Sequence, residues 1–244
     1  MDAVVTFQSF ITTYTDFLTV AIHTILYERN IYPRTSFLSA RKYNFAVRQN
    51  RHPKVCKWIN DAVTAVETEL LKGAVERVAV VIYDRTDTPL ERFVFDLSRF
   101  PYVPPTEQAT PLERTNQAGE KVAILPQIDL EEQLRATMSK LSDCGARLRP
   151  IPDECTFTIA IELREDREPP IGHPQPWIPV QPSLQGRKGT ASQVSDDYHH
   201  GDASRTTPLR TVAAGDMLFE CWIEEGKAKL DMLASAGSST DASI

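Results

Sequence analysis

The sequence lacks the short motifs that mark most catalytic and cofactor sites. Its 244 residues contain no glycine-rich phosphate-binding loop, no GxGxxG, no HExxH and no GxSxG. The four cysteines lie far apart and form no CxxC pair, which argues against a zinc site and against a disulfide framework. We therefore expect a protein that is not an enzyme and that holds no metal ion or cofactor.

Basic residues are not in excess, because 27 Lys and Arg stand against 33 Asp and Glu and the formal net charge is −6. Sequence-independent binding to nucleic acid needs clustered basic side chains, so no direct contact with nucleic acid is predicted. No signal sequence is visible, and the most apolar segment, residues 17–27, is too short to span a bilayer. We expect an intracellular protein in a reducing compartment that does not contact membranes.

Two groups of residues could nonetheless carry chemistry. A thiol hydrolase would need Cys155 or Cys221 to be exposed beside a histidine, but both occupy strand positions where a small buried residue is expected. His199 and His200 resemble a metal-binding pair, yet their polar surroundings offer no fixed geometry. A solvated loop is the better interpretation of the histidine pair.

Apolar residues at steps of three and four predict three helices. The first covers residues 7–27 and has the widest apolar stripe, so it should lie at the centre of the core. The second covers residues 53–70, with a proline in its first turn and a glycine just beyond its end. The third is expected to be capped by Asp129 and ended by Gly145.

Strand patterns predict an antiparallel sheet beside these helices. A β-branched run followed by turn residues and a returning strand indicates a hairpin, and a strict apolar–polar alternation indicates a further strand. Residues 101–126 are rich in proline and polar groups and are predicted to form a loop. Strands are expected at residues 45–47, 78–83, 93–95, 156–163 and 218–224.

The C-terminal third differs in composition from the rest of the chain. Prolines are frequent there, and the segment at about 181–207 has too few apolar residues to pack, so it is predicted to be a disordered insertion. Residues 231–244 are small and polar and are predicted to form a flexible tail. We expect one domain, with a core at 1–163 and a loosely tethered extension at 164–230.

Two tryptophans of the extension suggest a binding surface. On the last predicted strand Phe219, Cys221 and Ile223 share one face, which leaves Trp222 on the opposite face between acidic residues. A large aromatic exposed on a polar face is typical of partner binding, although a tryptophan covered by a loop of the same chain is the alternative. Trp177 lies in a proline-framed island, where it could anchor the extension or clamp a ligand.

Seven segments carry a resemblance to a known family: Phe17–Tyr27, Ile31–Pro33, Arg41–Asn44, Val80–Asp84, Phe93–Phe95, Cys155–Thr158 and Pro176–Ile178. In order and spacing they resemble the HORMA domain family, and within it the branch of accessory subunits of DNA polymerase zeta. The resemblance covers nearly the whole chain. It implies an α+β HORMA fold, in which three helices pack on an antiparallel sheet and a C-terminal safety belt closes over a short peptide of a partner.

The resemblance also implies a function and the residues that serve it. The chain would be a non-catalytic adaptor in translesion DNA synthesis, located in the nucleus and the cytoplasm. A peptide of the catalytic subunit of DNA polymerase zeta would be trapped beside Trp58 and Trp177. The C-terminal domain of the scaffold translesion polymerase would bind at Thr206, Arg210, Glu220 and Trp222, and pairing with another HORMA domain would use Arg135, Lys140 and Ala146.

The same pattern leaves a second function open. A spindle-checkpoint or DNA-end-protection adaptor would have the same fold and the same belt but would trap other client peptides. The identity of the client, rather than the fold, distinguishes the two functions.

Overall fold

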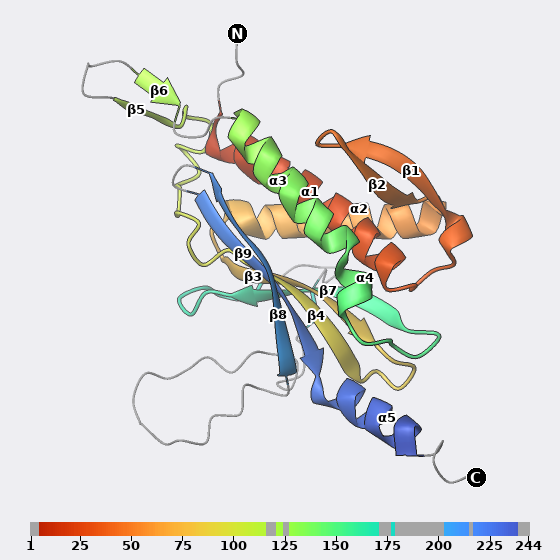
Figure 1. Ribbon diagram of the computed structural model, residues 1–244. Helices are drawn as coiled ribbons and strands as arrows, with labels where there is room; N and C mark the ends of the chain where they lie inside the picture. The colour runs from red at the N-terminus through yellow and green to blue at the C-terminus, as the bar shows by residue number, and fades with distance from the viewer. Residues whose placement is uncertain are drawn as a thin grey trace.

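The computed structural model describes residues 5–115, 121–123, 127–170, 177–178, 203–214 and 217–238 (Figure 1). Its elements in chain order are α1 (Phe7–Glu28), η1 (Arg34–Ser36), β1 (Phe37–Lys42), β2 (Phe45–Asn50), α2 (Pro53–Leu71), β3 (Val75–Tyr83), β4 (Pro89–Asp96), β5 (Glu113–Thr115), β6 (Lys121–Ala123), α3 (Gln127–Ser142), α4 (Cys144–Arg147), β7 (Thr156–Leu163), β8 (Ala203–Ala214), β9 (Met217–Gly226) and α5 (Lys227–Ser238).

A five-stranded antiparallel sheet forms one layer, with the order β7-β3-β4-β9-β8. Helices α1, α2 and α3 lie together against one of its faces, and the β1–β2 ribbon packs beside them (Figure 1). This arrangement confirms the predicted α+β class and the three helices on an antiparallel sheet.

Helix α1 lies at the centre of the core, as its apolar stripe predicted. Its first turn is fixed by a capping box, in which the side chains of Thr6 and Ser9 each accept a backbone N–H from the other residue. From Ala21 to Leu26 every side chain is buried. The ring of Phe17 packs edge-on against Phe95 of β4, with the ring centroids 6.0 Å apart. Each such buried aromatic stabilises the fold by roughly 1.5–3 kcal/mol relative to an exposed one.

Two predicted helix ends are wrong. Helix α3 begins at Gln127, so Asp129 lies in its first turn and not at its cap. The helix ends at Ser142, and Gly145 lies inside α4. A Cβ atom at position 145 would come within 3.0 Å of the carbonyl oxygen of Glu28. Glycine therefore allows α4 to approach the end of α1 closely.

Three segments predicted to be irregular are ordered in the structure. The predicted loop at 101–126 contains the β5–β6 hairpin. Strand β8 begins at Ala203, so residues 203–207 belong to a strand paired with β9 and not to the predicted insertion. Residues 231–238, predicted as tail, continue helix α5. The rest of the predicted insertion, 181–202, and of the predicted tail lie outside the described residues.

A buried cluster of charged side chains explains why α5 is ordered. The Lys229 ammonium donates to Glu91 at 2.5 Å and to Glu225 at 2.6 Å, and Arg29 donates two hydrogen bonds to the Glu91 carboxylate. None of these four side chains is more than 5% exposed. Burial alone would raise the pKa of Glu225, but the hydrogen bond and charge of Lys229 outweigh it and hold that pKa below its ordinary value. The cluster joins α1, β4, β9 and α5.

The buried His23 of α1 gives a testable pH dependence. Burial lowers the pKa of His23 to about 4, and its Nδ1 accepts the backbone N–H of Asn50 at 3.4 Å. The unfolded chain binds this proton near pH 6.5, whereas the folded protein binds it only near pH 4. The free energy of unfolding is therefore expected to fall by about 3 kcal/mol as the pH drops through this interval. Urea unfolding at pH 7 and at pH 4.5 measures the difference.

A matched pair of variants separates this histidine from the carboxylates that also titrate. In His23→Gln the side chain keeps an acceptor for the Asn50 N–H but does not titrate, so the stability should lose this part of its pH dependence. The exposed His52, changed to Gln, should leave the dependence intact. Equal pH slopes for the wild type and His23→Gln would contradict the assignment.

Candidate functional site

The path of the chain between the two edges of the sheet defines the candidate site. Strand β7 forms one edge and β8 the other. The chain leaves β7 at Leu163 and enters β8 at Ala203, so residues 164–202 connect opposite edges of the sheet. Four strand spacings separate these edges by about 19 Å. Consecutive strands usually pair side by side, and here that pairing is absent between β7 and β8.

Strand β7 is consequently a template to which another strand can be added. Among the described residues it pairs with β3 alone. On its helix-facing side Phe157 and Ile161 are only partly buried, although they pack against the main core. An edge strand with incompletely covered apolar side chains suits the addition of a partner strand, because backbone hydrogen bonds and side-chain burial then increase together.

Trp58 flanks this edge from helix α2. Its side chain is 43% exposed, and its ring meets Phe157 edge-on with the centroids 5.0 Å apart. Tyr32 approaches Phe157 as well, with a centroid separation of 6.4 Å. The sequence predicted a role for Trp58 but missed both Phe157 and Tyr32. The sequence pattern of β7 could have indicated Phe157, because the alternation places it on the same helix-facing side as Ile159.

Trp177 lies in the segment that connects the two sheet edges. It is half-buried and packs against the main core, whereas its neighbour Ile178 is 82% exposed. This tryptophan therefore ties the connecting segment to the body of the protein. Its joint action with Trp58 on one peptide stays a prediction.

The beginning of the connecting segment is also fixed to the body. The backbone N–H of Arg164 donates to the carbonyl of Ala74 at 2.9 Å, and its guanidinium donates to the carbonyl of Phe100 at 2.8 Å. The guanidinium of Arg167 lies over the ring of Tyr102, 4.8 Å from its centroid. Residues 164–167 are thus clamped onto the connection between α2 and β3 and onto the residues after β4.

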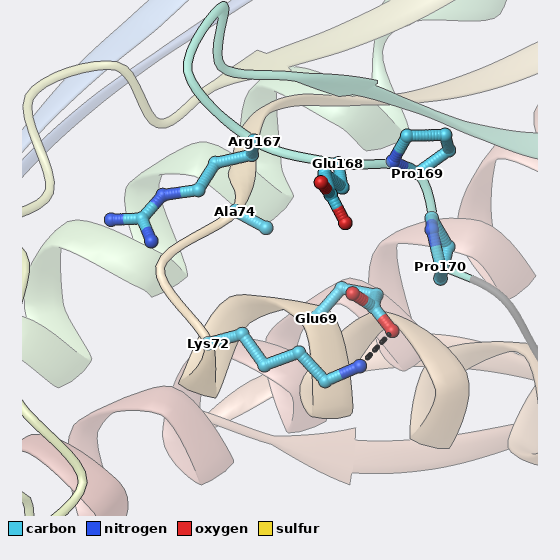
Figure 2. Close-up of a pocket in the computed structure, with 7 residues that line it drawn as sticks. All are labelled: Glu69, Lys72, Ala74, Arg167, Glu168, Pro169 and Pro170. Atoms are coloured by element: carbon cyan, nitrogen blue, oxygen red, sulfur yellow. Dashed lines mark hydrogen bonds and ion pairs between the residues drawn. The ribbon is translucent and has the colours of Figure 1, made fainter.

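A hollow of about 310 Å³ separates this clamped segment from the end of α2 (Figure 2). Lys72 and Glu69 form an ion pair at its floor, with 2.7 Å between the ammonium and the carboxylate, and Pro169 and Pro170 form one side. Figure 2 shows the Arg167 guanidinium directed away from this pair. The hollow lies beyond the Leu163 end of β7, so a strand added to β7 would continue toward it.

A second candidate surface lies on the sheet face away from the helices. Trp222 packs there against a small apolar cluster of Ala79, Val81 and Val94, and its indole N–H donates to Glu224 at 2.8 Å. The strand phase of Trp222 was predicted correctly, but the side chain is half-buried and not exposed. Ion pairs flank the cluster and tie the strands together: Arg77 with Asp96 and Glu162, and Arg92 with Glu162 and Glu224.

The four residues predicted for the scaffold polymerase do not share one face. Register places Thr206 beside Glu224 and Glu220 beside Thr211, on the same face as Trp222, and both Thr206 and Glu220 are exposed. Arg210 lies opposite Cys221 on the helix-facing side and donates to Gln133 of α3 at 2.6 Å. Arg210 therefore holds β8 against α3.

The three residues predicted for pairing with another domain follow one another along α3 and α4. Arg135 is half-exposed, and its guanidinium lies 3.6 Å from the carboxylate of Glu132, one turn away on the same helix. Lys140 is half-buried and Ala146 is exposed. None of them belongs to the buried core.

Three of the four cysteines, Cys144, Cys155 and Cys221, are buried. Burial raises the pKa of Cys144 to about 12 and also raises the pKa values of Cys155 and Cys221. A thiol hydrolase needs an accessible thiolate near neutral pH, so this alternative loses its support. In the part of the chain that the structure describes, no group of histidine, cysteine and acidic residues is arranged to hold a metal ion, and no helix has the length and apolarity to cross a membrane.

Comparisons with known proteins identify the family and agree with the fold. The HORMA domain family matches residues 11–183. The DNA polymerase zeta processivity subunit of Schizosaccharomyces pombe is 32% identical over 212 residues, covering 86% of this chain and 90% of that protein. The human mitotic spindle assembly checkpoint protein MAD2B is 31% identical over 215 residues, covering 86% and 88%. A chain in the crystal structure of the mitotic checkpoint complex has the same fold, with a TM-score of 0.63, 17% identity and coverage of 88% and 98%.

Proposed function

This chain belongs to the HORMA domain family, and from this premise we propose that it is the non-catalytic adaptor subunit of DNA polymerase zeta in translesion DNA synthesis. The names of its relatives in S. pombe and Arabidopsis thaliana support the polymerase assignment. The observation that carries the adaptor role is the edge position of β7, which among the described residues pairs with β3 alone, is flanked by Trp58 and is separated from β8 by the connection at 164–202.

The client is a short peptide of the catalytic subunit that adds as a sixth strand to β7. Backbone hydrogen bonds to β7 supply part of the affinity, and apolar side chains of the client cover Trp58 and Phe157. The connecting segment, anchored at Arg164 and Trp177, acts as a belt that passes over the bound strand. Enclosure slows dissociation more than it speeds association. The adaptor performs no reaction and needs no cofactor.

A second partner binds at the face that carries Trp222. We assign Thr206, Glu220 and Trp222 to the C-terminal domain of the scaffold translesion polymerase, and the adaptor then bridges the two polymerases. Arg210 acts indirectly on this surface, because its hydrogen bond to Gln133 fixes the position of β8. Pairing with another HORMA domain would use Arg135, Lys140 and Ala146. The nucleus, with the cytoplasm as a second location, is the expected compartment.

The alternative function is that of a spindle-checkpoint or DNA-end-protection adaptor. It is favoured by the names of the vertebrate relatives, which are called mitotic spindle assembly checkpoint proteins. Both functions use the same belt, so they differ only in the client.

Capture of the client tests the proposed function. The intact chain is co-expressed with overlapping fragments of the polymerase zeta catalytic subunit, and stable complexes are isolated by affinity and size-exclusion chromatography. We expect one short fragment to be retained through both columns. Retention of no fragment would contradict the assignment to the polymerase.

The Trp222 surface gives a further prediction. Changing Trp222 to Ala removes an interface aromatic, which should weaken binding of the scaffold polymerase's C-terminal domain at least about tenfold while client capture is unchanged. Isothermal titration calorimetry measures the first and co-purification the second. Thr110→Ala, at an exposed position outside this strand pair, is the control and should change neither. Loss of both interactions in Trp222→Ala would show a structural role.

A further inference from the structure

The net charge of −6 conceals a strongly basic stretch of sequence. Between Glu28 and Asp61 the chain has eight Lys and Arg residues and no Asp or Glu. In the structure these residues lie along the chain from the C-cap of α1 through η1 and the β1–β2 ribbon to the first turns of α2. The ribbon lies on the opposite side of the molecule from the β8–β9 hairpin (Figure 1). The charge of the whole chain is therefore a poor guide to this region.

Three of the eight charges are compensated by ion pairs, namely those of Arg29, Lys42 and Lys57. The other five side chains are exposed and form no ion pair with a residue that the structure describes. They are Arg34, Arg41, Arg48, Arg51 and Lys54, and we refer to them as the basic face. Glu28 is the acidic neighbour of Arg34 and Arg48, which leaves an uncompensated excess of positive charge.

Several groups of the basic face are held in fixed positions. The guanidinium carbons of Arg34 and Arg48 lie 4.6 and 4.9 Å from the centroid of the same Tyr27 ring. Arg41 donates a hydrogen bond to Asn44. Arg41 pairs with Ala46 across the ribbon, so Arg48 is its diagonal neighbour on the same face, at roughly 7–8 Å. An array of this kind loses little side-chain entropy when it meets a rigid ligand.

The N-terminus of α2 adds to the positive electrostatic potential of the basic face. No acidic residue occupies its first turn, and the side chain of its N-cap residue, His52, makes no capping hydrogen bond. The positive end of a 19-residue helix therefore lies next to Arg51 and Lys54. This helix end supports the basic face and would not form a site without it.

We propose that the basic face binds the phosphate backbone of duplex DNA. The inference rests on the proposed function to the extent that a polymerase subunit works beside DNA. Arginine forks match phosphate oxygens, and a duplex presents its phosphates as a stiff, ready-made array. An acidic peptide would have to be ordered on binding, at a cost in conformational entropy that a stiff duplex does not have. The net charge led us to expect no contact with nucleic acid. The clustering of basic side chains on one surface leads to the opposite expectation.

Fluorescence anisotropy of a labelled duplex with the intact chain tests the proposal. We expect binding in the micromolar range at low salt, with an affinity that falls linearly with salt on a double-logarithmic plot. The variant R34Q/R41Q/R48Q should bind at least about tenfold more weakly and reduce the slope of that plot by about 3. An unchanged affinity in this variant, or no binding of the wild type at low salt, would overturn the proposal.

Two controls separate charge from other causes. The variant R41K/R48K keeps the charge and should bind within about threefold of the wild type. Removing three exposed charges elsewhere, in R85Q/R99Q/K227Q, should leave most of the affinity and of the salt dependence. An equal loss in this second control would mean that net charge alone acts and would overturn a localised site. Polyglutamate that binds the basic face when duplex DNA does not would likewise overturn it in favour of an acidic protein.

Client capture by the same preparations distinguishes this proposal from the proposed function. R34Q/R41Q/R48Q should capture the client as the wild type does, because these arginines contact Tyr27 and Asn44 and not Trp58 or Phe157. A chain that captures no client but binds DNA through these arginines would end the polymerase assignment and leave the DNA surface standing. Capture of the client without DNA binding would do the reverse.

Discussion

Replacing Trp177 by alanine is expected to shorten the lifetime of the client complex about 100-fold while the protein stays folded. Truncation of a central interface tryptophan costs about 3 kcal/mol, and about 1.4 kcal/mol corresponds to a factor of ten. The effect should fall on dissociation, because Trp177 ties the belt to the body and an untied belt opens more often. The fold should survive, because Trp177 packs against the main core without being a buried member of it.

The measurement is the dissociation rate of a labelled client peptide under competition with unlabelled peptide. Trp177→Phe keeps an aromatic ring and should recover most of the lifetime. Trp58→Ala removes a contact of the peptide but leaves the belt tied, so it should weaken affinity without the full loss of lifetime. An unchanged dissociation rate in Trp177→Ala would contradict the assignment of this residue to the belt.

Replacing Lys229 by methionine is expected to lower the free energy of unfolding by about 3–5 kcal/mol. Its ammonium is the group that links the Glu91 and Glu225 carboxylates, and one oxygen of Glu225 is already buried without a hydrogen-bond partner. Removing the cation leaves the buried Glu225 carboxylate with only the Arg149 N–H and the Arg205 guanidinium, 3.7 Å away, to offset its desolvation. The loss should be concentrated in β9 and α5, where Lys229 and Glu225 lie.

Chemical unfolding gives the total loss, and amide hydrogen exchange shows where it falls. The exposed Lys227 is the matched control, and Lys227→Met should change the stability by less than about 0.5 kcal/mol. The double variant Lys229→Met/Glu225→Gln removes both charges of one pair and should recover part of the loss. If Lys229→Met and Lys227→Met were equally stable, the cluster would not anchor the C-terminal helix.

The sequence predicts best those elements whose pattern is local. The apolar stripe of α1 and the alternation of β7 each identify an element and its buried face. The phase of Trp222 follows from the same alternation. Helix α5 was not predicted, because it is anchored by the ion pairs of Lys229 with Glu91 and Glu225. Glu91 lies 138 positions away in the chain.

The candidate site was predictable only in part. Similarity to a family pointed to Trp58. Its aromatic neighbour Phe157, and Tyr32 that packs on Phe157, come from other parts of the chain. The placement of Arg210 on the helix-facing side depends on an irregularity in the β8–β9 register between Pro208 and Arg210. No pattern in one strand reveals such a shift, because it depends on the pairing partner.

The basic face differs, because its residues can be found in the sequence without the structure. The net charge of the whole chain hides this local excess of basic residues. Only the fold shows that Arg34 and Arg48 meet at the Tyr27 ring. Net charge describes a chain, whereas recognition depends on the charge of one surface.

Addition of the client as a strand to β7 is the central claim, and amide hydrogen exchange of residues 156–162 tests it most directly. In the free protein the outward amides of β7 should exchange quickly, since among the described residues β7 pairs only with β3. With the client bound, alternate amides along β7 should be protected at least about 100-fold, because roughly 3 kcal/mol of local opening energy is added by new backbone bonds and enclosure. Unchanged exchange along β7, with protection appearing at the β8 edge, would contradict the account.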